Sequence, residues 1–146
     1  MTARALSRFA VLFAVLWPLV TAAPLASATV TPPGVGYTRP QLEQIVRDAA
    51  VLHGANAARL AAVVECESKW DPYAVGDRGR SRGLLQFHCE TPDCVGSLWA
   101  GLWPDVDPLP SRDEPEAAAD AAARAWALGE ARHWSCWRML YRGERP

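Results

Sequence analysis

The sequence predicts a small, mainly α-helical domain with little or no β-sheet. Two segments repeat apolar side chains at the three- and four-residue intervals of an amphipathic helix. Those side chains are Leu42, Ile45, Val46 and Ala49 in the first segment and Leu60, Val63 and Val64 in the second. A third segment, residues 113–132, is rich in alanine and opens with acidic residues and a proline, which suit a helix start. Sheet content is therefore expected to be low.

Residues 1–28 have the form of a secretory signal. Arg4 and Arg8 give it a positive start, residues 9–20 are an apolar run, and Ala26-Ser27-Ala28 is a small-residue cleavage site. The alternative is an uncleaved membrane anchor, which the cleavage site and the prolines of this region disfavour. We therefore expect a secreted or cell-wall-associated protein that has no membrane contact after the signal is cleaved.

A linker at residues 29–36 is expected to precede a single domain at residues 37–146. The linker contains Pro32-Pro33-Gly34 and has no apolar periodicity. The chain beyond the signal is long enough for one hydrophobic core and too short for two. Of 15 basic and 16 acidic side chains, the signal holds two arginines, which leaves a net charge near −3. This charge argues against nucleic-acid binding.

Capping residues mark the ends of the first two helices. Thr38 and Gln41 have the spacing of a capping box, and His53-Gly54 marks the end of the first helix. Asn56 is suited to cap the start of the second helix. His53 is expected to be a C-terminal helix residue and not a metal ligand, because no second ligand lies at a useful spacing.

Glu67 is predicted to lie on the apolar face of the second helix. It follows Leu60 by seven residues and so shares a stripe with Val63 and Val64. A carboxyl group that faces an apolar layer near a helix C-terminus favours its neutral form. A general acid needs a protonated group near neutral pH, which makes Glu67 the first catalytic candidate. The alternative is a glutamate that reaches solvent at a frayed helix end or pairs with an arginine.

The segment that follows adds two short motifs. Glu67-Ser68 is followed by the helix-breaking Asp71-Pro72, then by Ala74, and later by Gly83-Leu84-Leu85-Gln86. In this order the elements resemble the Glu-Ser and Gly-Leu-x-Gln motifs of lytic transglycosylases and goose-type lysozymes. The resemblance is close over residues 53–88, looser as far as residue 141 and absent before residue 37.

The resemblance implies a lysozyme-like domain with a cleft between the helix that ends at Glu67 and the Gly- and Arg-rich loop of residues 77–86. It implies that Glu67 is the catalytic acid and that Ser81 and Gln86 line the cleft. One position departs from the pattern: many relatives have an Asn three residues after a proline, where this chain has Ala118. The departure concerns how the sugar is held and not the acid.

Tyr73 and Asp77, which lie between the two motifs, are further candidates for substrate contact. Asp77 is also the one serious second carboxylate, because its loop is expected to return along the cleft. Most glycosidases need two carboxyl groups at the scissile bond, whereas a single acid can act with the N-acetyl group of the substrate. We therefore expect transglycosylation that ends in a 1,6-anhydromuramyl product, with hydrolysis by Glu67 and Asp77 as the alternative.

Three arginines, Arg78, Arg80 and Arg82, alternate with small residues beside the expected cleft. They are able to contact carboxylates of a peptidoglycan stem peptide or of the muramyl lactyl group. Such a run is more often a solvated loop, which is the interpretation favoured here.

The region around Trp99 and Trp103 is predicted to be a short helix followed by a loop. The two tryptophans share a helix face, and core packing is favoured over stacking on sugar rings.

The four cysteines, Cys66, Cys89, Cys94 and Cys136, predict disulfide bonds, since a secreted chain meets an oxidising compartment. Three pairings are possible. Closure of a short loop favours Cys89 with Cys94, which leaves Cys66 with Cys136 and ties the helix of Glu67 to the last helix. A zinc site is disfavoured because the paired C-x-x-C spacing is missing. No metal and no cofactor are expected.

The function expected from the resemblance is cleavage of the β-1,4 bond between N-acetylmuramic acid and N-acetylglucosamine in peptidoglycan glycan strands by a monomeric protein. Besides hydrolysis, two alternatives stay open: a secreted wall-binding module of the same fold, and a disulfide-stapled extracellular protein in which Glu67 is incidental.

Overall fold

The computed structural model describes residues 36–143 of the chain. The predicted signal at 1–28 and the predicted linker at 29–36, except Gly36, lie outside the described residues, as do residues 144–146. Within the described range, no helix has the length and apolar character that crossing a membrane requires.

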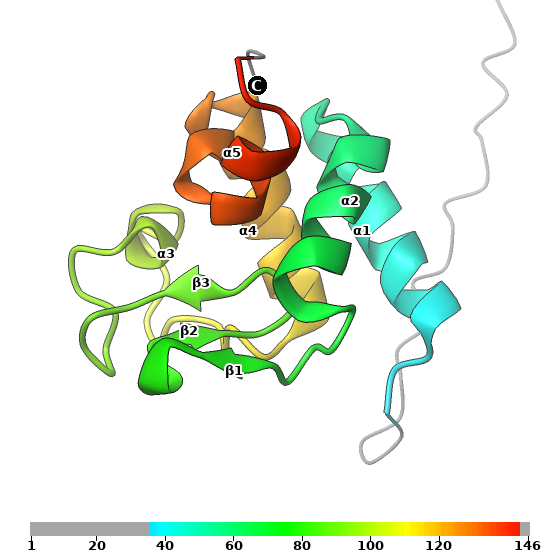
Figure 1. Cartoon of the computed structure of the whole chain (residues 1–146). Helices are drawn as coiled ribbons and strands as arrows, with labels where there is room; N and C mark the ends of the chain where they lie inside the picture. Colours follow the sequence, from blue (N-terminus) through cyan, green and yellow to red (C-terminus); the bar gives the residue numbers. More distant parts are fainter. Residues whose placement is uncertain (1–35, 144–146) are drawn as a thin grey trace, which may run out of the picture. The chain divides into compact units, whose positions relative to one another are not determined.

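The described chain is mainly α-helical with one small sheet, as predicted (Figure 1). The α-helices are α1 (Arg39–His53), α2 (Ala57–Ser68), α3 (Leu98–Gly101), α4 (Pro115–Ala127) and α5 (Ser135–Leu140). Two short 3-10 helices are η1 (Asp77–Gly79) and η2 (Glu130–His133). The strands are β1 (Val75–Gly76), β2 (Ser81–Arg82) and β3 (Phe87–His88), and they form an antiparallel sheet in the order β1-β2-β3.

The core lies where α1 and α2 pack and where α1 meets α4. Leu60, Val63 and Val64 are fully buried, which confirms the apolar stripe of α2. Helix α4 buries alanines on most of its circumference, among them Ala118, Ala119 and Ala121 to Ala123. A helix that is buried on most sides is a central helix of the domain. His53 at the end of α1 contacts Asp120 on the polar side of α4 at 2.6 Å.

The predicted caps of the first two helices are present. The Gln41 side-chain oxygen accepts a hydrogen bond from the backbone N–H of Thr38 at 2.8 Å, which is one half of a capping box. The Asn56 side chain accepts from the backbone N–H of Arg59 at 3.1 Å and so caps α2. Gly54 ends α1 in the left-handed conformation, at φ 69°.

The prediction for the alanine-rich segment was wrong at both ends. The expected helix over residues 113–132 is confined to α4, from Pro115 to Ala127. Proline is favoured at the first helical position, and here it begins the helix. Gly129 then adopts φ 83°, a left-handed conformation that stops the helix before η2.

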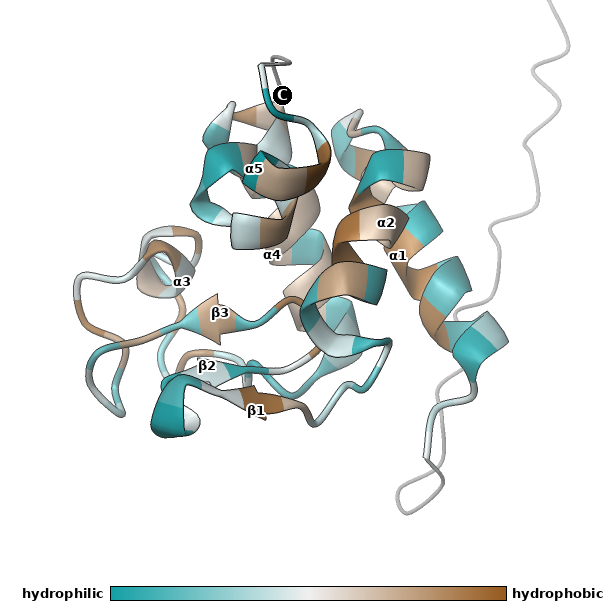
Figure 2. Cartoon of the chain, viewed as in Figure 1, coloured by the Kyte–Doolittle hydropathy of each residue, from teal (hydrophilic) through white to brown (hydrophobic). Residues whose placement is uncertain are grey.

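The Gly- and Arg-rich segment, predicted as a loop, folds into two consecutive hairpins, β1–β2 and β2–β3. Gly76 pairs with Ser81 across β1 and β2, and Ser81 pairs with His88 across β2 and β3. Figure 2 shows the hydrophilic turn η1 directly after the hydrophobic strand β1, whose Val75 is exposed. The turn before β3 contains Gly83 at φ +78°, where an added Cβ would lie 1.8 Å from the Arg112 carbonyl oxygen. Only glycine fits this position.

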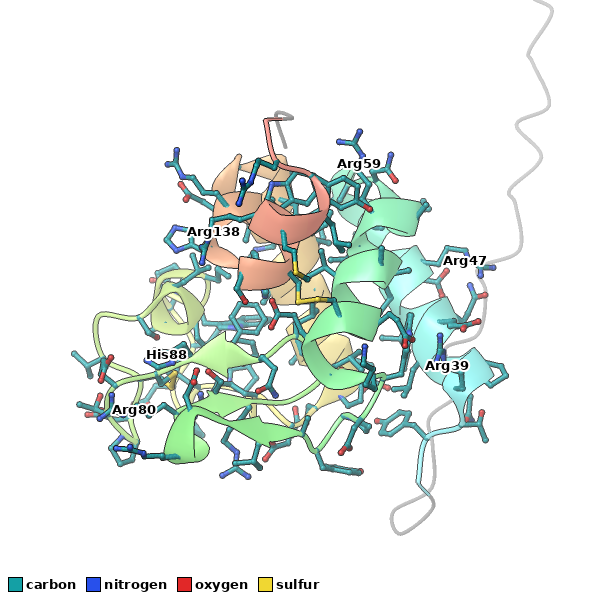
Figure 3. All side chains as sticks on the ribbon, viewed as in Figure 1. Arg39, Arg47, Arg59, Arg80, His88 and Arg138 are labelled. Atoms are coloured by element: carbon teal, nitrogen blue, oxygen red, sulfur yellow. A yellow bond between two sulfur atoms is a disulfide. The ribbon has the colours of Figure 1, made fainter. Side chains whose placement is uncertain are left out.

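Both predicted disulfides are present. Cys66 of α2 is bonded to Cys136 of α5, with 5.9 Å between their Cα atoms, and the bond is visible between the two helices in Figure 3. Cys89 is bonded to Cys94 after β3, with 4.8 Å between Cα atoms. Trp99 is 1% exposed and packs edge-on against Trp103, so the predicted core role is confirmed for Trp99.

Candidate active site

A cleft of about 560 Å³ lies between the C-terminal end of α2 and the three-stranded sheet. Its other walls come from the loop before α3 and from the segment that joins η2 to α5. This volume falls within the range of sites for small ligands. Four of the residues that sequence reasoning selected line the cleft: Glu67, Asp77, Ser81 and Gln86.

Glu67 enters the cleft from the last turn of α2 and is half-buried. Its Oε1 accepts a hydrogen bond from the backbone N–H of Cys136 at 3.1 Å and one from the Ser135 hydroxyl at 3.3 Å. Its other oxygen, Oε2, has no hydrogen-bond donor among residues 36–143. One carboxylate oxygen is thus held by the protein, and the other is left for a ligand.

The chain makes a tight turn directly after Glu67. The buried hydroxyl of Ser68 donates back to the Val64 carbonyl at 3.3 Å and accepts from the backbone N–H of Trp70 at 3.2 Å. Lys69 and Trp70 both adopt positive φ, at 56° and 66°. A positive φ costs energy for a residue other than glycine, and it persists only where neighbouring groups hold the backbone in place. The Arg39 guanidinium, which lies 4.4 Å from the Trp70 ring centroid, supplies part of that support.

Asp77 faces the same cleft from the turn η1. The Ser81 hydroxyl donates to Oδ2 of Asp77 at 2.6 Å, and His88 Nδ1 lies 3.1 Å from the same hydroxyl oxygen and 3.5 Å from Oδ2. The pKa of Asp77 is lowered from its usual value, first by the hydrogen bond from Ser81 and to a smaller extent by His88 and Arg80. The cleft therefore contains a carboxylate that stays ionised at neutral pH.

Gln86 has a structural role in the sheet. Its Nε2 donates to the carbonyl oxygens of Ala74 and Gly83, at 2.9 Å and 3.0 Å. Both amide hydrogens are therefore occupied, and a ligand can reach only the side-chain oxygen. That oxygen lies so close to Gly76 that a Cβ there would approach it to 2.5 Å.

Other residues selected from the sequence lie away from the cleft. Tyr73 is 58% exposed and is not among the lining residues. Ala118 is fully buried in α4, so this position does not reach a ligand in the cleft. Arg80 pairs with Glu90 at 3.0 Å and Arg82 with Asp113 at 2.8 Å, so carboxylates of this protein already pair with two of the three arginines.

Sequence reasoning missed two histidines that line the cleft, His88 and His133. His88 Nε2 lies 3.0 Å from Glu90 Oε1, and His133 Nε2 lies 2.8 Å from Glu130 Oε2. The pKa of Glu90 is lowered, first by its hydrogen bond to His88 and then by Arg80. The available signal for His88 was the alternation of a strand, since Phe87 is buried and the next side chain must point to the opposite face.

The arrangement suits acid catalysis supported by a second, ionised carboxylate. No group of three or more potential metal ligands occurs in the described part of the chain. Comparison of the chain with protein-family models, curated proteins and solved structures gives no match. The motif resemblance therefore stays a prediction.

Proposed function

We propose that this protein cleaves the β-1,4 glycosidic bond between N-acetylmuramic acid and N-acetylglucosamine in peptidoglycan, with Glu67 as the general acid. The observation that carries the proposal is the placement of Glu67: it is half-buried in the cleft, Cys136 and Ser135 hold its Oε1, and its Oε2 has no donor among residues 36–143. The Glu67-Ser68 and Gly83 to Gln86 motifs add the family resemblance. The two disulfides are consistent with function in an oxidising extracellular compartment.

In the proposed reaction, Glu67 in its protonated form donates a proton from Oε2 to the glycosidic oxygen as the bond to the muramyl C1 breaks. The N-acetyl oxygen of the muramyl unit supports the positive charge that develops at C1. Glu67, now a carboxylate, accepts the proton of the 6-hydroxyl, whose oxygen attacks C1 and forms the 1,6-anhydro ring. The acid is regenerated and no water is consumed. The fixed Oε1 keeps the carboxyl group oriented through both proton transfers.

Hydrolysis is the second candidate, and the position of Asp77 favours it. A hydrolase needs a second carboxylate at the bond, either to activate water or to attack C1. Asp77 lines the same cleft as Glu67, and the low pKa of its carboxyl group keeps it in the ionised form that a base requires. We rank it second because the Ser81 hydroxyl already occupies Oδ2 of Asp77.

Digestion of purified peptidoglycan, followed by chromatography and mass spectrometry of the released muropeptides, tests the proposal. The expected product ends in 1,6-anhydromuramic acid and is lost with Glu67→Gln. Products that carry one added water and disappear with Asp77→Asn would instead identify a hydrolase. If the protein binds peptidoglycan and releases nothing, it is a wall-binding module and the proposed activity is wrong.

A further inference from the structure

His88 lines the cleft, and each of its ring nitrogens lies within hydrogen-bond distance of a partner. Nδ1 is 3.1 Å from the Ser81 hydroxyl oxygen, and Nε2 is 3.0 Å from a carboxylate oxygen of Glu90. Ser81 in turn contacts Asp77 at 2.6 Å. Glu90, His88, Ser81 and Asp77 thus form one hydrogen-bonded chain, which we call the His88 chain.

The positions of the hydrogens in the His88 chain follow from the number of donors. Ser81 has a single hydroxyl hydrogen, and its short contact with the carboxylate of Asp77 takes that hydrogen. The hydroxyl can then only accept from Nδ1 of His88. An ionised Glu90 can only accept as well, so Nε2 must also donate. All the hydrogen bonds of the His88 chain therefore form together only when His88 is doubly protonated and cationic.

The backbone around His88 is fixed from several sides. Ser81 is its partner in the sheet register, and the following residue, Cys89, donates its backbone N–H to the Arg80 carbonyl at 3.0 Å. The Arg112 guanidinium donates to the carbonyl of Phe87 at 2.6 Å. The disulfide from Cys89 to Cys94 constrains the polypeptide backbone immediately after His88. The imidazole is therefore presented by a rigid segment.

We propose that cationic His88 is a positioning residue that holds the Asp77 carboxylate, through the Ser81 hydroxyl, in a fixed orientation in the cleft. Loss of the His88 proton removes one link, because Ser81 must then turn its hydrogen toward Nδ1 and release Asp77, or Nε2 must release Glu90. A fixed carboxylate stabilises the positive charge that forms on the sugar during cleavage. The contribution to cleavage rests on the proposed function, whereas the positioning of Asp77 does not.

Other charged groups surround the His88 chain. Arg80 forms an ion pair with Glu90, the last residue of the His88 chain. Figure 3 shows the Arg80 side chain near His88, on the same side of the molecule. Glu67 from α2 and His133 from η2 line the same cleft. Helix α3, which packs against β3, contributes no ionisable side chain. The charged Arg112 guanidinium also lies next to this segment, on the Phe87 and Arg80 carbonyls.

Nuclear magnetic resonance tests the positioning step in the purified protein. In His88→Gln the titration midpoint of the Asp77 carboxyl carbon should rise toward its ordinary value. His133→Gln is the matched control, because it removes the other histidine of the cleft, and it should leave the Asp77 midpoint in place. An Asp77 midpoint that does not respond to His88→Gln overturns the proposal.

A double-mutant cycle tests the contribution to cleavage. Because His88 acts through Asp77, His88→Gln should lower kcat/KM about tenfold in the wild-type background and have no further effect in Asp77→Asn. Independent effects that multiply, or an unchanged rate in His88→Gln, overturn this part. If the purified protein does not cleave peptidoglycan at all, the proposed function fails, and the Asp77 titration still decides whether His88 positions that carboxylate.

Discussion

The carboxylate of Glu67 accepts a hydrogen bond from the backbone N–H of Cys136 at 3.1 Å, and the neighbouring Cys66 is bonded to the sulfur of that same Cys136. The candidate acid and the disulfide thus join α2 to the start of α5 at one point. The same contact that orients the carboxyl group also satisfies a backbone donor of the first turn of α5, which otherwise lacks an intrahelical partner. Glu67 therefore has a structural as well as a proposed chemical role, and the two can be separated by mutation.

Replacement of Glu67 by Gln should separate these two roles. The Gln side-chain oxygen can still accept from Cys136 and Ser135, so the free energy of unfolding should change by less than about 1 kcal/mol. The acidic proton is lost, and the cleavage rate should fall by at least about a hundredfold. Glu67→Ala also removes the acceptor and should cost about 1 to 2 kcal/mol of stability. Urea denaturation and muropeptide release measure the two quantities; undiminished release in Glu67→Gln rules out the acid role.

The two disulfides should contribute unequally to stability. Cys66–Cys136 spans 70 residues of sequence and Cys89–Cys94 spans five. In the chain-entropy model, loops of these lengths correspond to about 4 and about 2 kcal/mol of unfolding free energy. Paired Cys→Ala variants, Cys66 with Cys136 and Cys89 with Cys94, should show this order in urea denaturation. Equal losses would mean that strain or residual structure outweighs loop length.

Substitution of Gly83 should damage the hairpin. An added Cβ meets the Arg112 carbonyl oxygen at 1.8 Å, and the residue must also keep φ +78°. We expect Gly83→Ala to lose more than about 2 kcal/mol of stability. Gly79→Ala is the matched control in the neighbouring β1–β2 turn, since Gly79 has φ +93° and nothing within 4 Å of an added Cβ. The control carries only the backbone penalty, about 1 kcal/mol, so similar losses in both variants would contradict a role for the Arg112 contact.

Removal of the Ser81 hydroxyl should shift the titration of Asp77. The hydrogen bond from Ser81 is the main cause of the lowered pKa of Asp77, so Ser81→Ala should raise that pKa toward its usual value. A lowered pKa in the folded state means that ionised Asp77 favours folding above the unfolded-state pKa of about 3.9. This contribution disappears as the pH falls through the folded-state pKa. Carbon NMR of the Asp77 carboxyl group checks the shift, and an unchanged midpoint in Ser81→Ala would assign the lowering to another group.

The sequence by itself determined the parts of this protein that depend on local pattern and on composition. Helical spacing of apolar residues located α1 and α2, and the caps at Gln41 and Asn56 were readable because a cap acts within three residues of its own helix start. The disulfide pairing followed from the even count of cysteines and the short Cys89–Cys94 loop. The ends of the alanine-rich helix could not be located from local pattern. Alanine favours a helix at every position, and the helix stops shortly before Gly129.

Only the tertiary structure decided which side chains meet at the cleft. The contact between Glu67 and Cys136 joins residues that are 69 positions apart, and no local pattern encodes such a distance. The same holds for Gly83. This position requires glycine because the Arg112 carbonyl, from a distant segment, lies where a Cβ would be. The His88 chain depends on the register of β2 against β3, which brings Ser81 opposite His88. Strand register is fixed by turn geometry and by side-chain packing across the sheet. A sequence can therefore suggest Glu67 and Asp77 as candidates. Only the folded chain shows which neighbours hold their carboxylates.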